Sequence, residues 1–217
     1  MLAELQQHLS DIYRVDNACN VLDFVITDPA LADILGRDAT LANAEETLLL
    51  AEDGEELALS LFLDAALLER LEEHRPLDAL RAELLDDLWK VLEGVSHFNC
   101  IVWKASRDRS VSLLELELQG EIDKFVSTTL LALAQDNAAL SDKLHGWLFD
   151  DVSFRKELDA EQLERYRFAN DYAARYCHGL QKRLQRDAAR TFEELRHFFR
   201  LPASDKISYI HSRSWHG

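Results

Sequence analysis

Three glutamates near the middle of the chain have spacing that suits a carboxylate site. Glu115 and Glu117 are two residues apart, and Glu121 follows four residues later. On a β-strand, alternate residues share one face, so Glu115 and Glu117 would lie side by side, with Glu121 in the first turn of a following helix. Such carboxylates could bind a hard cation or divide acid and base roles. The pattern is also typical of the solvated face of a half-buried sheet, with Lys104 neutralising a glutamate.

A second set of polar residues recurs at helical spacing further along the chain. Arg165, Tyr172, Arg175 and Lys182 follow one another at intervals of seven, three and seven residues. On one continuous helix they would form a stripe, with His178 on a neighbouring stripe. The cations could bind an anionic ligand such as a phosphate, and the tyrosine could stack on it. Pairing of these cations with the acidic part of the same chain is the alternative.

The remaining motifs point to no particular reaction. The sequence contains no Gly-x-Ser-x-Gly elbow, glycine-rich phosphate loop, Gly-x-Gly-x-x-Gly, His-Glu-x-x-His or EF-hand loop. Asp142-x-x-His145 and Glu194-x-x-His197 have the spacing used by di-iron carboxylate bundles, but no bridging glutamates accompany them. We therefore attribute that spacing to chance. The sequence leaves the identity of any cofactor unknown.

Two segments are expected to form β-hairpins. Asp53-Gly54 separates two leucine-rich runs within residues 46–63, which predicts a two-residue turn that pairs Leu50 with Leu57.

The second expected hairpin carries the carboxylates. Its strands are predicted at residues 99–105 and 111–118, joined by the charged turn 106–110, because leucines alternate with polar residues along the second strand. Two hairpins would be more stable together than apart, so we expect them to form one sheet.

Helical periodicity accounts for the rest of the chain. Helices are predicted at residues 2–13, 17–26, 29–36, 64–74, 76–94, 120–135, 138–149, 160–186 and 191–200. The predicted fold class is α+β and predominantly helical, with two antiparallel β-hairpins forming a small sheet packed against helices and a helical C-terminal segment. We expect one domain over residues 1–217, with a helical and hairpin part (1–149) and a helical C-terminal part (150–217).

The charge of the chain is unevenly distributed. The formal net charge is −16, which makes nucleic acid an improbable partner because phosphate binding requires a basic surface. Residues 150–217 contain 13 Lys and Arg against 11 Asp and Glu, whereas residues 1–149 contain 11 against 29. This asymmetry suggests that the C-terminal helices pack across the acidic part, within one chain or between two. Simple solvated helix faces are the alternative explanation.

Composition also bears on the cellular setting. The first ten residues lack the basic and apolar regions of a secretory signal, and no apolar run is long enough to span a membrane. Three widely spaced cysteines indicate neither a disulfide framework nor a thiolate zinc site. We expect a soluble, cytoplasmic protein with reduced thiols.

Two functional hypotheses remain open. The first, which we favour from the sequence, is a non-enzymatic binding or regulatory protein with a protein partner or a second copy of itself. The alternative is a small enzyme or metal-dependent protein with its site at Glu115, Glu117 and Glu121.

Overall fold

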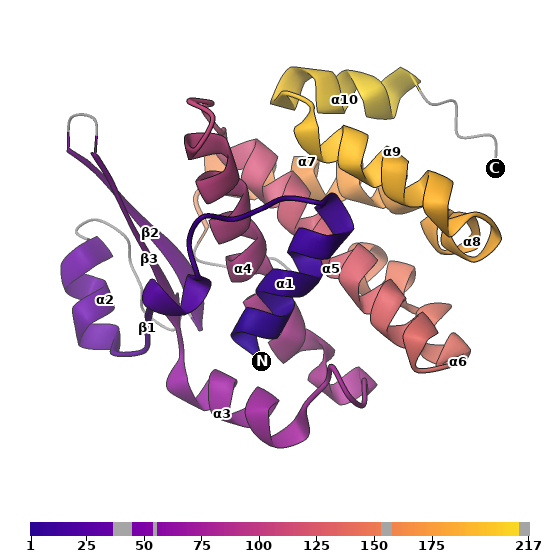
Figure 1. Cartoon of the computed structure of the whole chain (residues 1–217), viewed down its shortest axis with the longest axis horizontal. Helices are drawn as coiled ribbons and strands as arrows, with labels where there is room; N and C mark the ends of the chain where they lie inside the picture. Colours follow the sequence, from indigo (N-terminus) through magenta and orange to yellow (C-terminus); the bar gives the residue numbers. More distant parts are fainter. Residues whose placement is uncertain (37–44, 54–55, 153–157, 213–217) are drawn as a thin grey trace.

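A computed structural model describes residues 1–36, 45–53, 56–152 and 158–212, and within them helices predominate over one small sheet (Figure 1). The α+β class with mostly helical content is therefore confirmed. The elements in chain order are α1 (Leu2–Tyr13), η1 (Val21–Asp23), β1 (Val25–Ile26), α2 (Pro29–Gly36), β2 (Glu46–Asp53), β3 (Glu56–Leu63), α3 (Ala65–His74), η2 (Ala82–Leu84), α4 (Leu85–Ala105), α5 (Leu113–Ala134), α6 (Ala138–Ser141), η3 (Gly146–Asp150), α7 (Ala160–Cys177), α8 (Leu180–Arg186), α9 (Ala188–Arg200) and α10 (Ala203–Ser212).

Helix α5 lies at the centre of the fold, in contact with α1, α4 and α7 (Figure 1). The sheet and α2 lie at one edge, and α8, α9 and α10 lie on the other side. A continuous apolar core runs from Leu2 and Leu5 of α1 to Ile210 of α10, and its burial is the main force that holds these layers together. Within the described ranges, no helix combines the length and apolar character needed to cross a membrane.

The first hairpin is confirmed, with a different register. Strands β2 and β3 pair antiparallel, with Leu50 opposite Leu59 and Asp53 opposite Glu56, so the predicted pairing of Leu50 with Leu57 was two residues off. A shift of two leaves every side chain on its predicted face, because the side-chain period of a strand is also two. Strand β1 adds to β3 in parallel, where the sequence had predicted a helix over residues 17–26.

The prediction of a second hairpin was wrong. Residues 99–105 form the end of helix α4, and helix α5 begins at Leu113. Gly94 was expected to stop the preceding helix. Instead it lies inside α4, where an added Cβ would come within 2.8 Å of Leu61 Cδ1 on β3, so the glycine permits close packing of helix on sheet. Ser112 begins α5 as its N-cap, its Oγ accepting a hydrogen bond from the Glu115 amide at 3.2 Å.

The surroundings of α5 explain why its sequence resembles a strand. Every residue from Glu115 to Gly120 is buried, because neighbouring helices cover α5 on several sides. A helix covered in this way has no single apolar stripe, so its leucines need not follow a helical period.

The C-terminal helices differ from their predicted bounds at two turns. Asp159 caps α7 at the predicted helix start, in a reciprocal pair of hydrogen bonds with Gln162. The predicted helix over 160–186 is broken, however, because Gly179 adopts φ 67° and begins α8 in a new direction. Helix α9 begins behind the cap Asp187, ahead of the predicted start at Thr191.

A buried ion-pair network fixes α10 to the centre of the fold. Lys206 is fully buried, with its Nζ 3.2 Å from Glu115 Oε1 and 3.0 Å from Gln119 Oε1. The Lys104 ammonium binds the other oxygen of Glu115. One C-terminal cation, Lys206, therefore pairs with the acidic part at Glu115, whereas Arg167, Arg175 and Lys182 lie on exposed surface.

Asp123, two turns along α5, completes this network with neutral partners. Its Oδ2 accepts a hydrogen bond from Ser96 Oγ at 2.6 Å, and its Oδ1 accepts from Gln119 Nε2 at 2.9 Å and from the Tyr13 hydroxyl. Burial nonetheless raises the pKa of Asp123 to about 6.

Replacing Glu115 should destabilise the fold strongly. E115Q leaves two buried ammonium groups without their acidic partner, and loss of one partner of a buried pair costs about 3–5 kcal/mol. Urea unfolding should show that loss for E115Q, whereas E164Q, an exposed glutamate on α7, should stay within about 0.5 kcal/mol of wild type. An E115Q protein as stable as E164Q would contradict the structural role of this pair.

Candidate metal centre

Helices α4 and α5 each present a pair of ligand-type side chains to the other. Glu93 and His97 are four residues apart on α4, and Glu117 and Glu121 are four residues apart on α5. Residues at this spacing lie on one face of a helix. Because the two helices run antiparallel in contact, the pairs meet at their interface.

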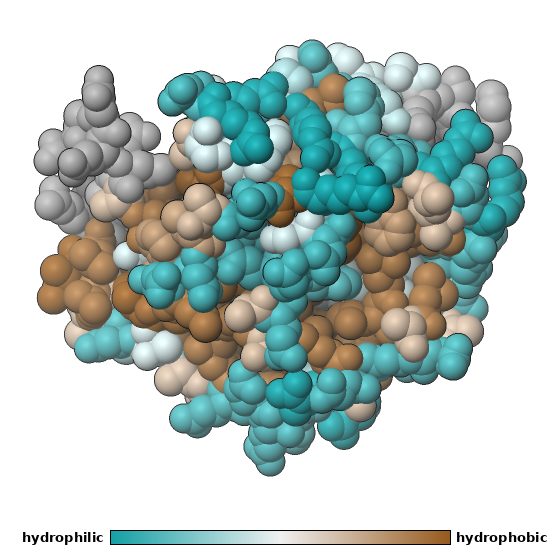
Figure 2. Space-filling model, in the orientation of Figure 1, coloured by the Kyte–Doolittle hydropathy of each residue, from teal (hydrophilic) through white to brown (hydrophobic). Residues whose placement is uncertain are grey.

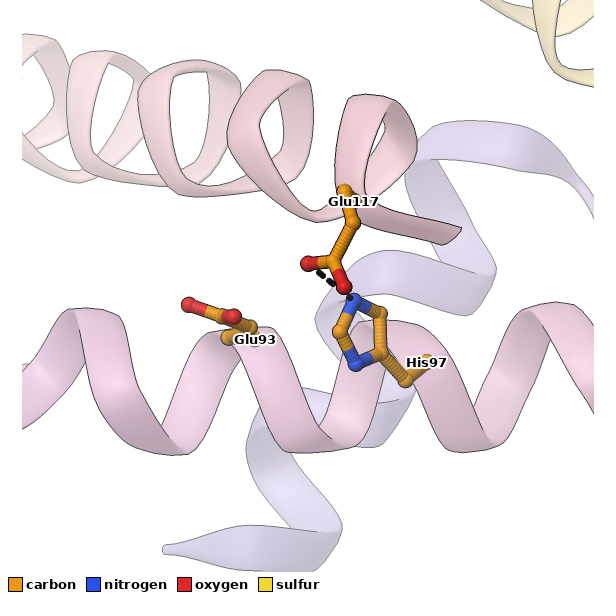
Figure 3. Close-up of side chains that lie close together, drawn as sticks. All are labelled: Glu93, His97 and Glu117. Carbon is orange, nitrogen blue, oxygen red and sulfur yellow. Dashed lines mark ion pairs between the residues drawn. The ribbon is translucent and has the colours of Figure 1, made fainter. Parts of the chain in front are cut away.

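Three of these side chains converge closely enough to share one ion. One oxygen from each of Glu93 and Glu117 and one ring nitrogen of His97 all lie within 4.8 Å of one another. His97 Nε2 is 3.9 Å from Glu117 Oε2, and Figure 3 shows the imidazole directed at Glu117 with Glu93 on the same side of α4. We refer to Glu93, His97 and Glu117 as the triad.

Gly120 makes room for the triad. An added Cβ at this position would lie 3.1 Å from His97 Nε2 and 3.6 Å from Glu93 Cγ. Glycine inside a helix costs about 1 kcal/mol relative to alanine. Here the missing side chain lets the imidazole approach α5.

Two cations flank the triad. Lys124 Nζ lies 3.0 Å from Glu93 Oε2 and 2.7 Å from Glu121 Oε1, and so neutralises the far side of the cluster. Arg165 of α7 has its Nε 3.8 Å from Glu117 Oε1. Lys124 thus lies between Glu93 and Glu121, whereas His97 Nε2 and Glu117 Oε2 face each other at 3.9 Å.

Burial sets the protonation of the cluster. It raises the pKa of Glu117 to about 8, with the charge of Glu93 adding to the effect, and it raises the pKa of Glu121. Burial lowers the pKa of His97, so its ring is neutral at pH 7. Neutral imidazole is the form that ligates a metal. His97 is 8% exposed. The backbone of Leu116 approaches its ring, but no hydrogen bond of good geometry reaches Nε2 within the described residues.

The donor set suits a first-row transition ion. Carboxylate oxygens favour Mn²⁺ and related hard ions, whereas imidazole favours Zn²⁺ and Fe²⁺. Three protein ligands leave coordination positions open for water or substrate, as in catalytic metal sites. Such an ion would also provide the missing partner for His97 and reduce repulsion between the glutamates.

Two of the three predicted carboxylates lie at this cluster. Glu117 belongs to the triad. Glu121 is linked to the triad by Lys124, which forms ion pairs with both Glu121 and Glu93. Glu115 does not join them, because residues two apart on a helix point in roughly opposite directions. It binds Lys104 instead, the pairing that the alternative interpretation had anticipated.

The predicted anion-binding stripe is not formed as one surface. Arg165 alone of its members reaches the cluster around the triad. Arg175 pairs with Asp171 at 2.7 Å, and the Tyr172 hydroxyl lies 3.3 Å from His211 Nε2.

His178 and Lys182 lie beyond the end of α7. The ring of His178 packs edge-on against His145, with 5.8 Å between ring centroids, and Lys182 is exposed on α8. His145 Nε2 lies 3.0 Å from the Ala174 carbonyl oxygen. Across the described ranges, the metal-capable group includes neither His145 nor His197.

Sequence reasoning missed Glu93, His97 and Lys124. The helix was predicted to end at Gly94 and a strand to begin at residue 99, so Glu93 and His97 fell in different elements. The signal that could have found them is Glu-x-x-x-His followed by Glu-x-x-x-Glu, which places four ligand-type residues on facing helices.

Comparisons with known proteins add no identification. No protein-family model matches the chain, and no curated protein or solved structure shows significant similarity to it. The chemistry of the cluster therefore rests on its own geometry.

Stability of the metal-free protein should rise as the pH falls from 8 to 6. Glu117 has a folded-state pKa of about 8 against an ordinary value of 4.5, so the folded state holds a proton that the unfolded state has released. Each pH unit within this window adds at most about 1.4 kcal/mol to the free energy of unfolding. Urea unfolding in chelator at pH 8 and pH 6 measures the change, which should be smaller in E117Q and unaltered in E164Q. An identical pH dependence in wild type and E117Q would contradict this assignment.

Proposed function

We propose that the chain is a metal-dependent protein that binds one divalent transition ion, such as Mn²⁺, Fe²⁺ or Zn²⁺, through Glu93, His97 and Glu117. The observation that carries the proposal is the convergence of the buried His97 ring with two carboxylates, whose ligand atoms all lie within 4.8 Å of one another, while no well-aligned hydrogen bond within the described residues reaches His97 Nε2. This proposal keeps the metal-dependent alternative from the sequence but changes its ligands. Glu117 and Glu121 remain at the site, whereas Glu115 serves the fold.

The site has the features of a reactive centre more than those of a structural one. A structural ion is usually enclosed by four protein ligands, whereas the triad supplies three. The side chain of Glu93 is 23% exposed, so water can reach the cluster. A bound ion would act there as a Lewis acid, polarising a substrate oxygen or lowering the pKa of a water molecule.

Metal titration tests the proposal. Isothermal titration calorimetry of chelator-treated protein with Mn²⁺ or Zn²⁺ should give one ion per chain. Loss of a group that only orients a ligand typically weakens metal binding 10–100-fold, so H97A and E117Q should weaken it about 100-fold or more. E164Q is the matched control for the glutamate and should bind as wild type.

In the same titration, two glycine-to-alanine variants distinguish a local effect on the metal site from a general effect of such a substitution on the fold. G120A places a methyl group against His97 Nε2 and should weaken binding, whereas the Cβ of G146A would meet Asp150 Oδ2 at an ordinary 3.7 Å and should not. Wild-type protein that binds no ion, or an H97A variant that binds normally, would refute the proposed centre.

The binding or regulatory role remains a second candidate, with homodimerisation as its simplest form. Helix α2 exposes Leu31, Ile34 and Leu35, with Ile34 71% exposed, and Leu22 and Leu50 are further exposed apolar side chains. The apolar surface at the left of Figure 2 lies where α2 is drawn in Figure 1. Contiguous exposed apolar surface is typical of interaction sites.

Light scattering across protein concentrations tests the dimer. Wild type should approach twice the chain mass of 24.9 kDa, and I34E should remain monomeric because it would bury a charge at the interface. Monomeric wild type at every concentration would exclude the homodimer.

A further inference from the structure

Arg165 lies against the triad with hydrogen-bonding capacity unused. Its Nε is buried and makes no hydrogen bond within the described ranges. The distance of 3.8 Å from this atom to Glu117 Oε1 is too long for a hydrogen bond. The guanidinium also lies over the ring of Tyr166, 5.6 Å from its centroid. A buried N–H group without an acceptor is costly, so an acceptor from outside the chain would stabilise this arrangement.

The position of Arg165 indicates the sign of that acceptor. Arg165 is a permanent cation, and an ion bound by the triad would lie beside it, because both contact Glu117. A ligand that contacts both positive charges is favoured when it is negatively charged.

We infer that Arg165 and the metal ion together bind the carboxylate group of a small organic acid, which is the substrate class of this site. The inference rests on the proposed function. A carboxylate matches the planar fork of a guanidinium and can bind a metal ion as well. A phosphate group carries about −1.5 to −2 at pH 7 and costs more to bury, so a carboxylate suits a mostly buried site better. The ligand can enter beside Glu93 and Arg165, whose side chains are 23% and 17% exposed.

Cobalt provides a direct readout, because the visible absorption of Co²⁺ changes when a ligand enters its coordination shell. Chelator-treated protein is first titrated with Co²⁺ alone and then, at fixed ionic strength, with acetate, inorganic phosphate or uncharged acetamide. Acetate should change the spectrum in a saturable way, and acetamide should not.

Variants on α7 test the role of Arg165. R165Q should bind acetate about tenfold more weakly or worse, since a charge-assisted hydrogen bond is lost. It should bind Co²⁺ at least as tightly as wild type, because a repelling positive charge has been removed. R165K keeps the charge without the fork and should be intermediate. R167Q removes an exposed arginine from the same helix and should match wild type.

The outcomes separate the two claims. If Co²⁺ does not bind to wild type, the proposed metal function fails before any anion is added, and the inference fails with it. If Co²⁺ binds but acetate leaves the spectrum unchanged, or acts equally on R165Q and wild type, the metal function stands and the carboxylate site is overturned. An Arg165-dependent response to phosphate alone would also overturn the carboxylate assignment.

Discussion

A charged group that is buried away from water needs a partner of opposite charge or hydrogen bonds inside the protein. Helix α5 buries several charged side chains at the centre of the fold. Its buried residues include Glu115, Glu117, Asp123 and Lys124. Unpaired burial of any one of them would cost several kcal/mol, a large fraction of the stability of a typical domain. The positions of the neighbouring cations, above all the fully buried Lys206, follow from this demand.

The two sides of α5 meet the demand differently. Around Glu115, two lysines supply the opposite charge, and Asp123 is satisfied by hydroxyl and amide donors. Around Glu117, the closest cation among the described residues is 3.8 Å away, and the imidazole of His97 is neutral at pH 7. On the first side, ammonium groups of the chain itself neutralise Glu115, although within the described ranges its Oε1 has only the ion-pair contact with Lys206. The second side is completed by an external cation in our account. This contrast distinguishes a structural network from a site more directly than the number of carboxylates does.

The sequence predicts the features that depend on local interactions and fails for those that depend on burial by distant elements. The hairpin at Asp53 and the cap Asp159 were predictable, because turn and cap chemistry is local. The start of α5 over residues 113–118 was not, because burial on several sides removes the apolar stripe that marks a helix, whereas the helix predicted over 120–135 matches the rest of α5. Gly94 suggested a helix end, and Gly120 was not recognised as part of the site. Each glycine permits a close contact with another element, β3 for Gly94 and α4 for Gly120, which the local sequence does not reveal. The carboxylates at Glu117 and Glu121 were found from their spacing in the sequence, but their partners required the true pairing of α4 with α5.

Anomalous diffraction from crystals grown with Mn²⁺ tests the central claim most directly. Carboxylate and imidazole ligands lie about 2.0–2.2 Å from a bound first-row ion. We predict a single anomalous peak at that distance from Glu93, His97 and Glu117, with Lys124 still bound to Glu121 and the network around Glu115 unchanged. A triad without a peak at saturating Mn²⁺, or an ion held by other residues, would contradict the account.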